Sequence, residues 1–361
     1  MPSRVNLENA NVDALCALTL GPARSGAALE HVASLDPAER DALLSLADSN
    51  HVVLRSLAPV LRYAADRGDA DLGAWAAKAT VRERGRIANA LKFLAEITRE
   101  LETAGCPVTV IKTLEHWPDL GNDLDLYSTA DERAVVKVMT SRLHARVEPR
   151  SWGDRLAQKW NFAIPGLAEL VEVHVQRLGQ TGEHIAMAKR FVTRRRPRAV
   201  NGYTFQVPAP EEAVIVATLQ RMYRHFYFRV CDMVNTAALM ESGALDYAEL
   251  KRAADVGGVW PGVATYLTVV SDYAGRYRGA PVAMPAEVRA AAAFGGDKIF
   301  VRARFLRVPV MPEGAGLYTR QVTTTALRGD VPAMFRLTLL PPLASAAAIA
   351  CRITGSDKGI W

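Results

Sequence analysis

The sequence predicts an α+β fold in which a small mixed β-sheet lies between two helical regions. Residues 1–104 and 210–295 repeat their apolar side chains at helical spacing. The segment between them instead carries short β-branched runs that are bounded by turn residues. With 361 residues, 50% of them hydrophobic, the chain can bury a large core and form two or three domains.

The first hundred residues predict helices. Asp36 is a suitable N-cap for a helix over 37–46, and apolar residues recur at helical spacing over 53–61. A long helix is predicted from about 72 to 104, where Gly105 ends it because glycine readily adopts the left-handed conformation of a C′ residue.

The central segment predicts the strands of the sheet. A capping box at Thr129–Glu132 predicts a helix that begins within this segment and ends near Leu143. A further strand is expected at 203–208, after a basic stretch over 189–198. The strands expected in the sheet are 107–112, 123–127, 145–148, 160–164 and 169–176.

The C-terminal half predicts a second helical region followed by a tail. Alternation over 299–310 marks the only strand-like pattern expected there. The apolar run 337–351 contains prolines and polar residues and is too short to span a membrane, so a core-packed helix is favoured over a surface-lying one. The helices are expected at 211–241, 246–255, 259–275 and 285–294. The predicted division is an N-terminal helical region (1–84), an α/β core (85–208), a helical domain (209–295) and a C-terminal tail (296–361).

Charge and cysteine content restrict the function classes. A net charge of +6 and a pI of about 9.2 suit a phosphate-bearing substrate without demanding nucleic acid, and an arginine-rich surface would give the same values. The N-terminus lacks the apolar core of a signal peptide. The four cysteines are widely separated, which indicates neither a zinc site nor a disulfide framework and favours the reducing cytoplasm: Cys16, Cys106, Cys231 and Cys351.

Two of the predicted strands carry acids on one face. Asp123 and Asp125 are two residues apart, and Glu172, 47 residues after Asp125, is followed at the same interval by His174. Side chains alternate across a strand, so each pair points to one side of the sheet. Carboxylates are rarely buried unless they are paired or hold a metal. Asp123, Asp125 and Glu172 therefore form a candidate site for one or two Mg²⁺ ions, the usual equipment for nucleotidyl or phosphoryl transfer.

A second Asp-x-Asp pair in the same chain serves as a comparison. Asp69 and Asp71 lie in a polar segment that contains Gly68 and Gly73. That composition is typical of a turn, so this pair is interpreted as solvated loop carboxylates. The pair at 123 and 125 differs because apolar residues interleave it and a second acid-bearing strand follows.

The order of these motifs resembles a known family. Ile111-Lys112-Thr113, then Asp123-Leu124-Asp125-Leu126, then Glu172-Val173-His174 resembles the bacterial "uncharacterised nucleotidyltransferase" family of the DNA-polymerase-β-like superfamily. The helix with Arg221, Arg224 and His225, followed by Arg229 and Asp232, resembles the family's helical half, so the resemblance covers about 85–275. Two positions depart from the family pattern. Thr113 replaces the small glycine that lets a backbone approach phosphate, and Glu172 replaces an aspartate.

The resemblance implies a nucleotidyltransferase fold that uses a nucleoside triphosphate, with ATP the first choice, and Mg²⁺ or Mn²⁺. Asp123 and Asp125 would hold a metal that bridges the phosphates, and Glu172 would hold a second metal or act as base on the acceptor. Lys112, Thr113, Arg224 and His174 are the expected nucleotide-binding residues. The acceptor would offer a hydroxyl or amine on a small molecule, a protein or RNA.

Structural interpretations stand beside these roles. The acids could form ion pairs with arginines of the helical domain, Lys112 could face solvent at a sheet edge, and His174 could be a satisfied core residue. Arg224 and its neighbours Arg221 and His225 could face solvent or form interdomain salt bridges. Thr113 and Glu172 also favour an alternative function, a catalytically degenerate binding or regulatory protein with this fold. A weaker alternative is an RNA-directed protein that uses the basic stretch 194–198.

Overall fold

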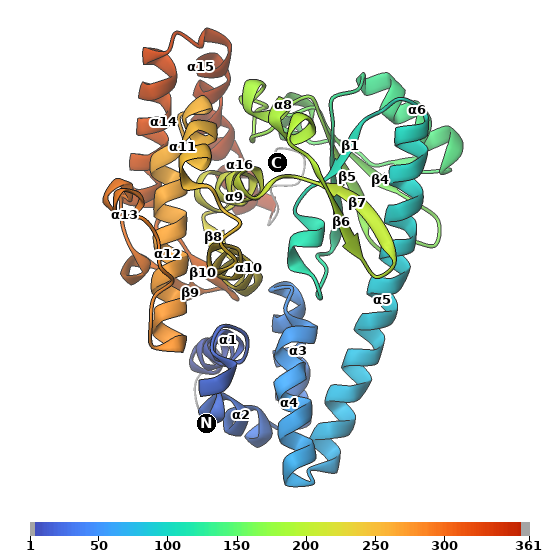
Figure 1. Cartoon of the computed structure of the whole chain (residues 1–361), viewed down its shortest axis with the longest axis vertical. Helices are drawn as coiled ribbons and strands as arrows, with labels where there is room; N and C mark the ends of the chain where they lie inside the picture. Colours follow the sequence, from blue (N-terminus) through green and yellow to red (C-terminus); the bar gives the residue numbers. More distant parts are fainter. Residues whose placement is uncertain (1–3, 355–361) are drawn as a thin grey trace.

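The structure is a computed structural model that describes residues 4–354. It confirms the α+β class: helices predominate, and one five-stranded mixed sheet lies among them. Figure 1 shows the sheet beside the long helix α5, with helices α9 to α16 on its other side and α1 to α4 below. Among the described residues, no helix is both long and apolar enough to cross a membrane.

The N-terminal region is helical, as expected. Asp36 and Glu39 form a capping box at the start of α3, and Gly105, with φ of +75°, follows the end of α5. Asp69 lies in the loop, where it accepts a hydrogen bond from Leu72 N–H and caps α5; Asp71 is exposed as expected but lies in the first turn of the helix and not in the loop. The helices are α1 (Arg4–Leu20), η1 (Pro22–Arg24), α2 (Gly26–Ser34), α3 (Pro37–Ser49), α4 (Val53–Arg67) and α5 (Ala70–Thr103).

The central sheet has the strand order β1-β2-β5-β4-β3, with β2 and β5 parallel and the other neighbours antiparallel. One face buries Leu124, Leu126, Val171 and Val173 in a core shared with α5 and α6. The side chains that alternate with them lie on the other face. The elements are β1 (Val108–Val110), η2 (Thr113–His116), β2 (Asp123–Ser128), α6 (Glu132–Arg142), β3 (Arg146–Val147), α7 (Trp152–Leu156), β4 (Lys159–Ala163) and β5 (Leu170–Val175).

The expected helix over 211–241 is interrupted. The chain widens into the π-helix η3 and turns at Phe226, whose φ is +53°. It then pairs as β8 with β10 of the tail. The strand β6, within and beyond the basic stretch, was also not expected; it forms a hairpin with β7. The elements are α8 (Ala186–Thr193), β6 (Arg196–Val200), β7 (Tyr203–Val207), α9 (Pro210–Thr218), η3 (Leu219–His225), β8 (Tyr227–Phe228) and α10 (Val230–Glu241).

The remaining chain is helical apart from the two short strands in the region where alternation was noted. Ile349 and Ile353 are exposed in the last helix, so the expectation of a core-packed helix is wrong. The elements are α11 (Tyr247–Val256), α12 (Trp260–Arg278), α13 (Ala286–Ala291), η4 (Gly296–Lys298), β9 (Phe300–Arg302), β10 (Phe305–Arg307), η5 (Val310–Gly314), α14 (Ala315–Leu327), α15 (Val331–Thr338) and α16 (Leu340–Thr354).

The buried apolar side chains form two large clusters. Each cluster joins segments that are far apart in the sequence. One belongs to the α/β unit and joins α5 to the sheet and to the hairpin β6–β7. The other joins the N-terminal helices to the C-terminal ones, so that Val12 and Leu15 of α1 share a core with α10 and α12. The four-part division of the sequence stays a prediction.

Candidate functional site

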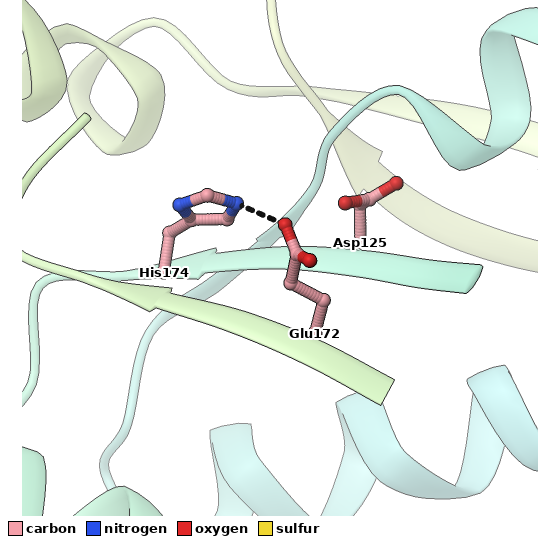
Figure 2. Close-up of side chains that lie close together, drawn as sticks. All are labelled: Asp125, Glu172 and His174. Carbon is pink, nitrogen blue, oxygen red and sulfur yellow. Dashed lines mark hydrogen bonds and ion pairs between the residues drawn. The ribbon is translucent and has the colours of Figure 1, made fainter. Parts of the chain in front are cut away.

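Two of the three acids predicted from the sequence meet on the polar face of the sheet. Asp125 of β2 is paired in register with Glu172 of the parallel strand β5, and His174 follows on the same face. Figure 2 shows the three side chains rising from adjacent strands toward one another. One ligand atom from each lies within 4.8 Å of the others, so Asp125, Glu172 and His174 can hold a metal ion.

Asp123 lies on the same strand but outside this group of three. It stands opposite Leu170 in the register, at the open end of the strand pair, and it is exposed. Its carboxylate lines the same pocket as Asp125 and Glu172. The residue is exposed, but the pocket partly desolvates its carboxylate; this desolvation and the charge of Glu172 raise its pKa above the ordinary value, against the opposing effects of Lys112 and Lys159.

Two buried lysines neutralise the acids. Lys112 Nζ forms a close ion pair with Asp125 Oδ1 and lies 3.6 Å from Glu172 Oε1. Lys159, on β4 beside β5, lies 2.9 Å from Glu172 Oε2 and 2.8 Å from Asp154 Oδ1. The interpretation of Lys112 as a solvent-facing lysine is therefore wrong. The other lysine was not expected, because it belongs to a neighbouring strand that carries no acid motif.

Lys112 is held in an unusual backbone conformation. Its φ is +59° and ψ −55°, and the N–H of Thr113 donates a hydrogen bond of 2.5 Å to the carbonyl of Ile111. These features describe a γ-turn, which is rare and strained for a residue other than glycine. The turn ends β1 and directs the Lys112 side chain toward the acids. The strained backbone thus places a positive charge in the site.

The charges around the acids shift their pKa values in opposite directions. Burial and the neighbouring carboxylates raise the pKa of Asp125 above its ordinary value, although Lys112 partly offsets this. Burial alone would also raise the pKa of Glu172, but Lys112, Lys159 and the hydrogen bond from His174 hold it well below the ordinary value. Glu172 is thus the firmly ionised member of the pair, and Asp125 keeps its proton to higher pH.

His174 orients Glu172. Its Nε2 lies 2.7 Å from Glu172 Oε1, and burial lowers the pKa of the imidazole to about 4 despite the favourable carboxylate. The neutral ring therefore donates through Nε2, which leaves Nδ1 as an acceptor. This nitrogen is buried and has no hydrogen-bond partner in residues 4–354. In a core histidine with all its hydrogen bonds satisfied, this nitrogen would have a partner. That interpretation therefore accounts for Nε2 but not for Nδ1.

The acids face a polar pocket of about 200 Å³. Its other walls come from η3, β8 and the segment after it, which supply Arg221, Arg224, His225 and Arg229. Arg221 is buried and forms an ion pair with Asp232 at 2.7 Å, while its Nη1 has no hydrogen-bond partner within the described chain. The π-helix thus brings two arginines and a histidine onto the pocket wall, where sequence spacing alone had favoured solvent exposure or salt bridges.

The histidines of the pocket add little positive charge. Burial and nearby arginines lower the pKa values of His51, His116 and His225 well below the ordinary value, so all three are neutral near pH 7. The permanent cations that line the pocket are Lys112, Arg221, Arg224 and Arg229. Carboxylates on one side and guanidinium groups on the other are the complement of a metal-bound polyphosphate.

Thr113 positions the acid-bearing strand. Its Oγ1 accepts a hydrogen bond of 2.7 Å from the N–H of Asp125, and the side chain is buried. Thr113 was expected to be a nucleotide-binding residue, in which case its hydroxyl could donate to a phosphate. In the structure it is engaged with the backbone at the start of β2, although the residue still contributes to the pocket wall.

Arg86 of α5 anchors both acid-bearing strands, a role that no pattern in the sequence indicates. It donates to Glu169 at 2.5 Å, just before β5, and to the carbonyls of Leu120 and Gly121 at 3.0 and 3.1 Å, just before β2. Glu83 lies 2.6 Å from the same guanidinium. Within a long helix rich in arginine, such a residue resembles a solvated one.

Two of the four arginines in the basic stretch 194–198 are neutralised by acids of the protein itself. Arg194 forms ion pairs with Glu211 and Glu212 at 2.9 and 3.1 Å, and Arg195 pairs with Glu102 at 2.5 Å. Such internal pairing reduces the charge that the stretch could offer to RNA.

Comparison with known proteins adds no assignment: no family model matches the chain, and no curated protein matches it.

Proposed function

We propose that this protein is a Mg²⁺- or Mn²⁺-dependent nucleotidyltransferase that moves a nucleoside monophosphate from a nucleoside triphosphate, ATP in the first instance, to a hydroxyl or amine acceptor. The observation that carries the proposal is the pocket of about 200 Å³ in which Asp123, Asp125 and Glu172 face Arg221, Arg224 and Arg229. A resemblance in motif order between residues 85 and 275 supports the same reaction class.

The donor set suits a divalent cation. Asp125 and Glu172 supply carboxylate oxygens, and His174 would supply Nε2 in the tautomer that carries its proton on Nδ1 instead of donating to Glu172. Asp123 is the proposed additional ligand at the open end of the strands. Carboxylates suit Mg²⁺ and Mn²⁺, and the imidazole makes Mn²⁺ at least as good a fit. When bound, the ion would neutralise charge on the phosphates during transfer.

The protein's own cations would hold the polyphosphate. Lys112, Arg224 and Arg229 line the pocket, and Arg221 offers a donor that is buried and unpaired in the described chain. A buried guanidinium donor without a partner is costly, and a phosphate oxygen would satisfy it. These residues come from the end of β1, from η3 and from the residue after β8, so they would orient the nucleotide between the sheet and the helical half.

Glu172 suits a ligand better than a base. A group whose pKa is held well below the ordinary value is ionised but binds a proton weakly. Lys112, Lys159 and His174 lie close to Glu172 and lower its pKa. Glu172 could abstract a proton from an acceptor only after these partners were lost. We therefore assign it first to metal binding.

A degenerate nucleotidyltransferase fold that binds without catalysis is the second candidate. The specific observation in its favour is that Lys112 and Lys159 already pair with Asp125 and Glu172. A site whose acids are internally neutralised can be stable without any ion. Thr113 and Glu172, which depart from the family pattern, favour the same alternative.

The test is calorimetric titration with ATP, with and without Mg²⁺, of the wild type and the Asp123→Asn/Asp125→Asn variant. The transferase proposal expects binding that requires Mg²⁺ and is lost in the variant, followed by pyrophosphate release in an acceptor screen. Binding that ignores Mg²⁺ supports the degenerate scaffold. Failure of the wild type to bind any of the four nucleotides would reject the transferase and favour a degenerate scaffold whose acids serve structure.

The proposed compartment is the reducing cytoplasm. Cys16, Cys106 and Cys231 are free thiols buried in the structure. Burial raises the pKa of Cys106 and Cys231, which keeps these thiols protonated and unreactive.

A further inference from the structure

A second and larger cavity, of about 530 Å³, lies behind the acid pocket. It is bounded by the hairpin β6–β7, by helices α9 and α10, and by the turn η2 with the loop after it. Figure 1 shows the hairpin and these two helices near the middle of the molecule. Its volume is within the range of small-molecule sites, about 300 to 1,000 Å³.

The walls of this cavity are mainly apolar. Leu114, Val207, Val214 and Leu239 line it together with three prolines. Several polar side chains in the wall already have partners. Arg55 donates to Asn235 Oδ1 at 2.5 Å and to the carbonyl of Trp117 at 2.5 Å, and Thr236 is bonded to Tyr266 at 2.7 Å. These groups build the wall and leave little capacity for a ligand.

Three ionisable side chains in the cavity are not engaged in this way. Glu115 Oε1 is inaccessible to solvent and has no hydrogen-bond partner among the residues described. Burial raises the pKa of this carboxyl to about 8, and Arg198 only partly offsets the effect. Arg198 is half-buried and Arg196 exposed; residues 4–354 offer neither guanidinium a hydrogen bond or ion pair. A buried acceptor beside free guanidinium groups in an apolar cavity is costly unless a ligand completes it.

We propose that this cavity is a binding site for a small molecule with an apolar or aromatic body, an N–H donor at one end and an anionic group at the other. Glu115 would accept from the N–H group, and Arg198, with Arg196 at the rim, would bind the anion. Guanidinium groups bind carboxylates and phosphates alike, so the anion could be either. The apolar walls would cover the body of the ligand.

This site is separate from the acid pocket but shares a wall with it. The turn η2 presents Leu114 and Glu115 to the cavity, whereas Thr113 and His116 line the acid pocket. Arg55 and Asn235 hold the turn in place. Arg55 donates to the carbonyl of His116 at 2.9 Å, and Asn235 Nδ2 lies 2.9 Å from Nδ1 of His116. A ligand in the cavity therefore has no direct access to the acids and is not the acceptor in a direct transfer.

Two probes distinguish the sources of the anion. L-tryptophan carries a carboxylate and guanosine 5′-monophosphate carries a phosphate; both have N–H donors on an aromatic or aliphatic body. Tryptamine and guanosine are their counterparts without the anion. Calorimetric titration of the full chain with each of the four, up to about 10 mM, would detect any Kd below about 1 mM.

The proposal expects one or both anionic probes to bind, and their counterparts to bind at least about tenfold more weakly. Arg198→Ala and Glu115→Met should each weaken binding of the anionic probe by about tenfold or more, and Ala217→Phe, which fills the cavity, should abolish it. Arg133→Ala, an exposed arginine on α6, is the matched control and should bind as the wild type does. Thermal unfolding identifies any variant that fails to fold.

Three results would overturn the proposal. The first is that neither anionic probe saturates the wild type. The second is a loss of discrimination. Either the folded Arg198→Ala and Glu115→Met variants bind the anionic probe as well as the wild type does, or the wild type binds tryptamine and guanosine as well as it binds the anionic probes. The third is that binding is lost in Asp123→Asn/Asp125→Asn, because the probe would then occupy the acid pocket. The last comparison also keeps this test independent of the proposed transferase activity.

Discussion

Asp125 and Glu172 occupy directly paired positions on the parallel strands β2 and β5. Each carboxylate also has its own buried lysine, Lys112 for Asp125 and Lys159 for Glu172. Two acids this close together would repel each other strongly if both were ionised and unpaired. The two lysines supply the compensating charge in the structure. A metal ion that binds here would have to replace their ammonium groups.

Removing one acid should weaken metal binding. We expect Asp125→Asn to lower the affinity for Mn²⁺ by about tenfold or more, since a carboxylate ligand is replaced by a neutral amide. Asp71→Asn, in the other Asp-x-Asp pair, is the matched control because Asp71 is exposed at the start of α5. Electron paramagnetic resonance of free Mn²⁺ measures both affinities. Equal affinities in the two variants would contradict a site at Asp125.

Removing the second lysine should destabilise the fold in a way that a cation repairs. Lys159→Met leaves the carboxylates of Asp154 and Glu172 without their buried partner, which should cost about 3 kcal/mol or more in the free energy of unfolding. Mn²⁺ at millimolar concentration should restore more stability to this variant than to the wild type, because the ion occupies the place of the lost charge.

Urea unfolding with and without Mn²⁺ checks that expectation. Lys137→Met, an exposed lysine on α6, is the control and should change stability little. If Mn²⁺ stabilises Lys159→Met no more than the wild type, the acids do not exchange a lysine for a metal, and the degenerate scaffold gains support.

Metal affinity should depend on pH over an unusually high range. A proton on Asp125 competes with the metal, and its pKa is raised above the ordinary value of about 3.9. Affinity should therefore keep rising from pH 5 to pH 8 as this proton is lost. The pKa of His174, about 4, keeps its ring neutral across the same range, so it adds little to the slope. Mn²⁺ titrations at several pH values would show a flat profile above pH 5.5 if the ligands were ordinary carboxylates.

Arg86 should support the site from a distance. Arg86→Ala removes a guanidinium that joins α5 to Glu169 and to the carbonyls before β2, and it leaves Glu169 buried without this partner. We expect a loss of about 3 kcal/mol in the free energy of unfolding. Arg84→Ala, an exposed arginine of the same helix, is the control. Chemical denaturation measures both, and equal losses would mean that the anchoring role is wrong.

The sheet and the face of its acids could be predicted because they depend on local pattern. Alternation places Asp125 with its neighbours on one face from the sequence alone, and short β-branched runs mark the strands. The pairing partners could not be predicted in the same way. Lys159 reaches Glu172 only because β4 lies beside β5, and strand order is a property of the whole fold.

The helical half shows the opposite limit. Apolar spacing predicted one helix over 211–241, and the structure interrupts it with η3, Phe226 and β8. Periodicity detects where a helix is favourable but does not detect pairing with a distant strand, here β10 of the tail. That interruption brings Arg224 to the pocket, so the departure from local pattern lies next to the site.

The shared core of the two ends of the chain has a consequence for synthesis. Helix α10 begins at Val230, 210 residues after α1 ends at Leu20, and the two bury their apolar faces in one cluster. At about 5 to 20 residues per second, a ribosome needs roughly 10 to 40 s to make that stretch. The first helices must wait that long with apolar surface uncovered, while the α/β unit made in between can close its own core. We therefore expect helix α1 and its neighbours to be open to chaperone binding until α10 is made.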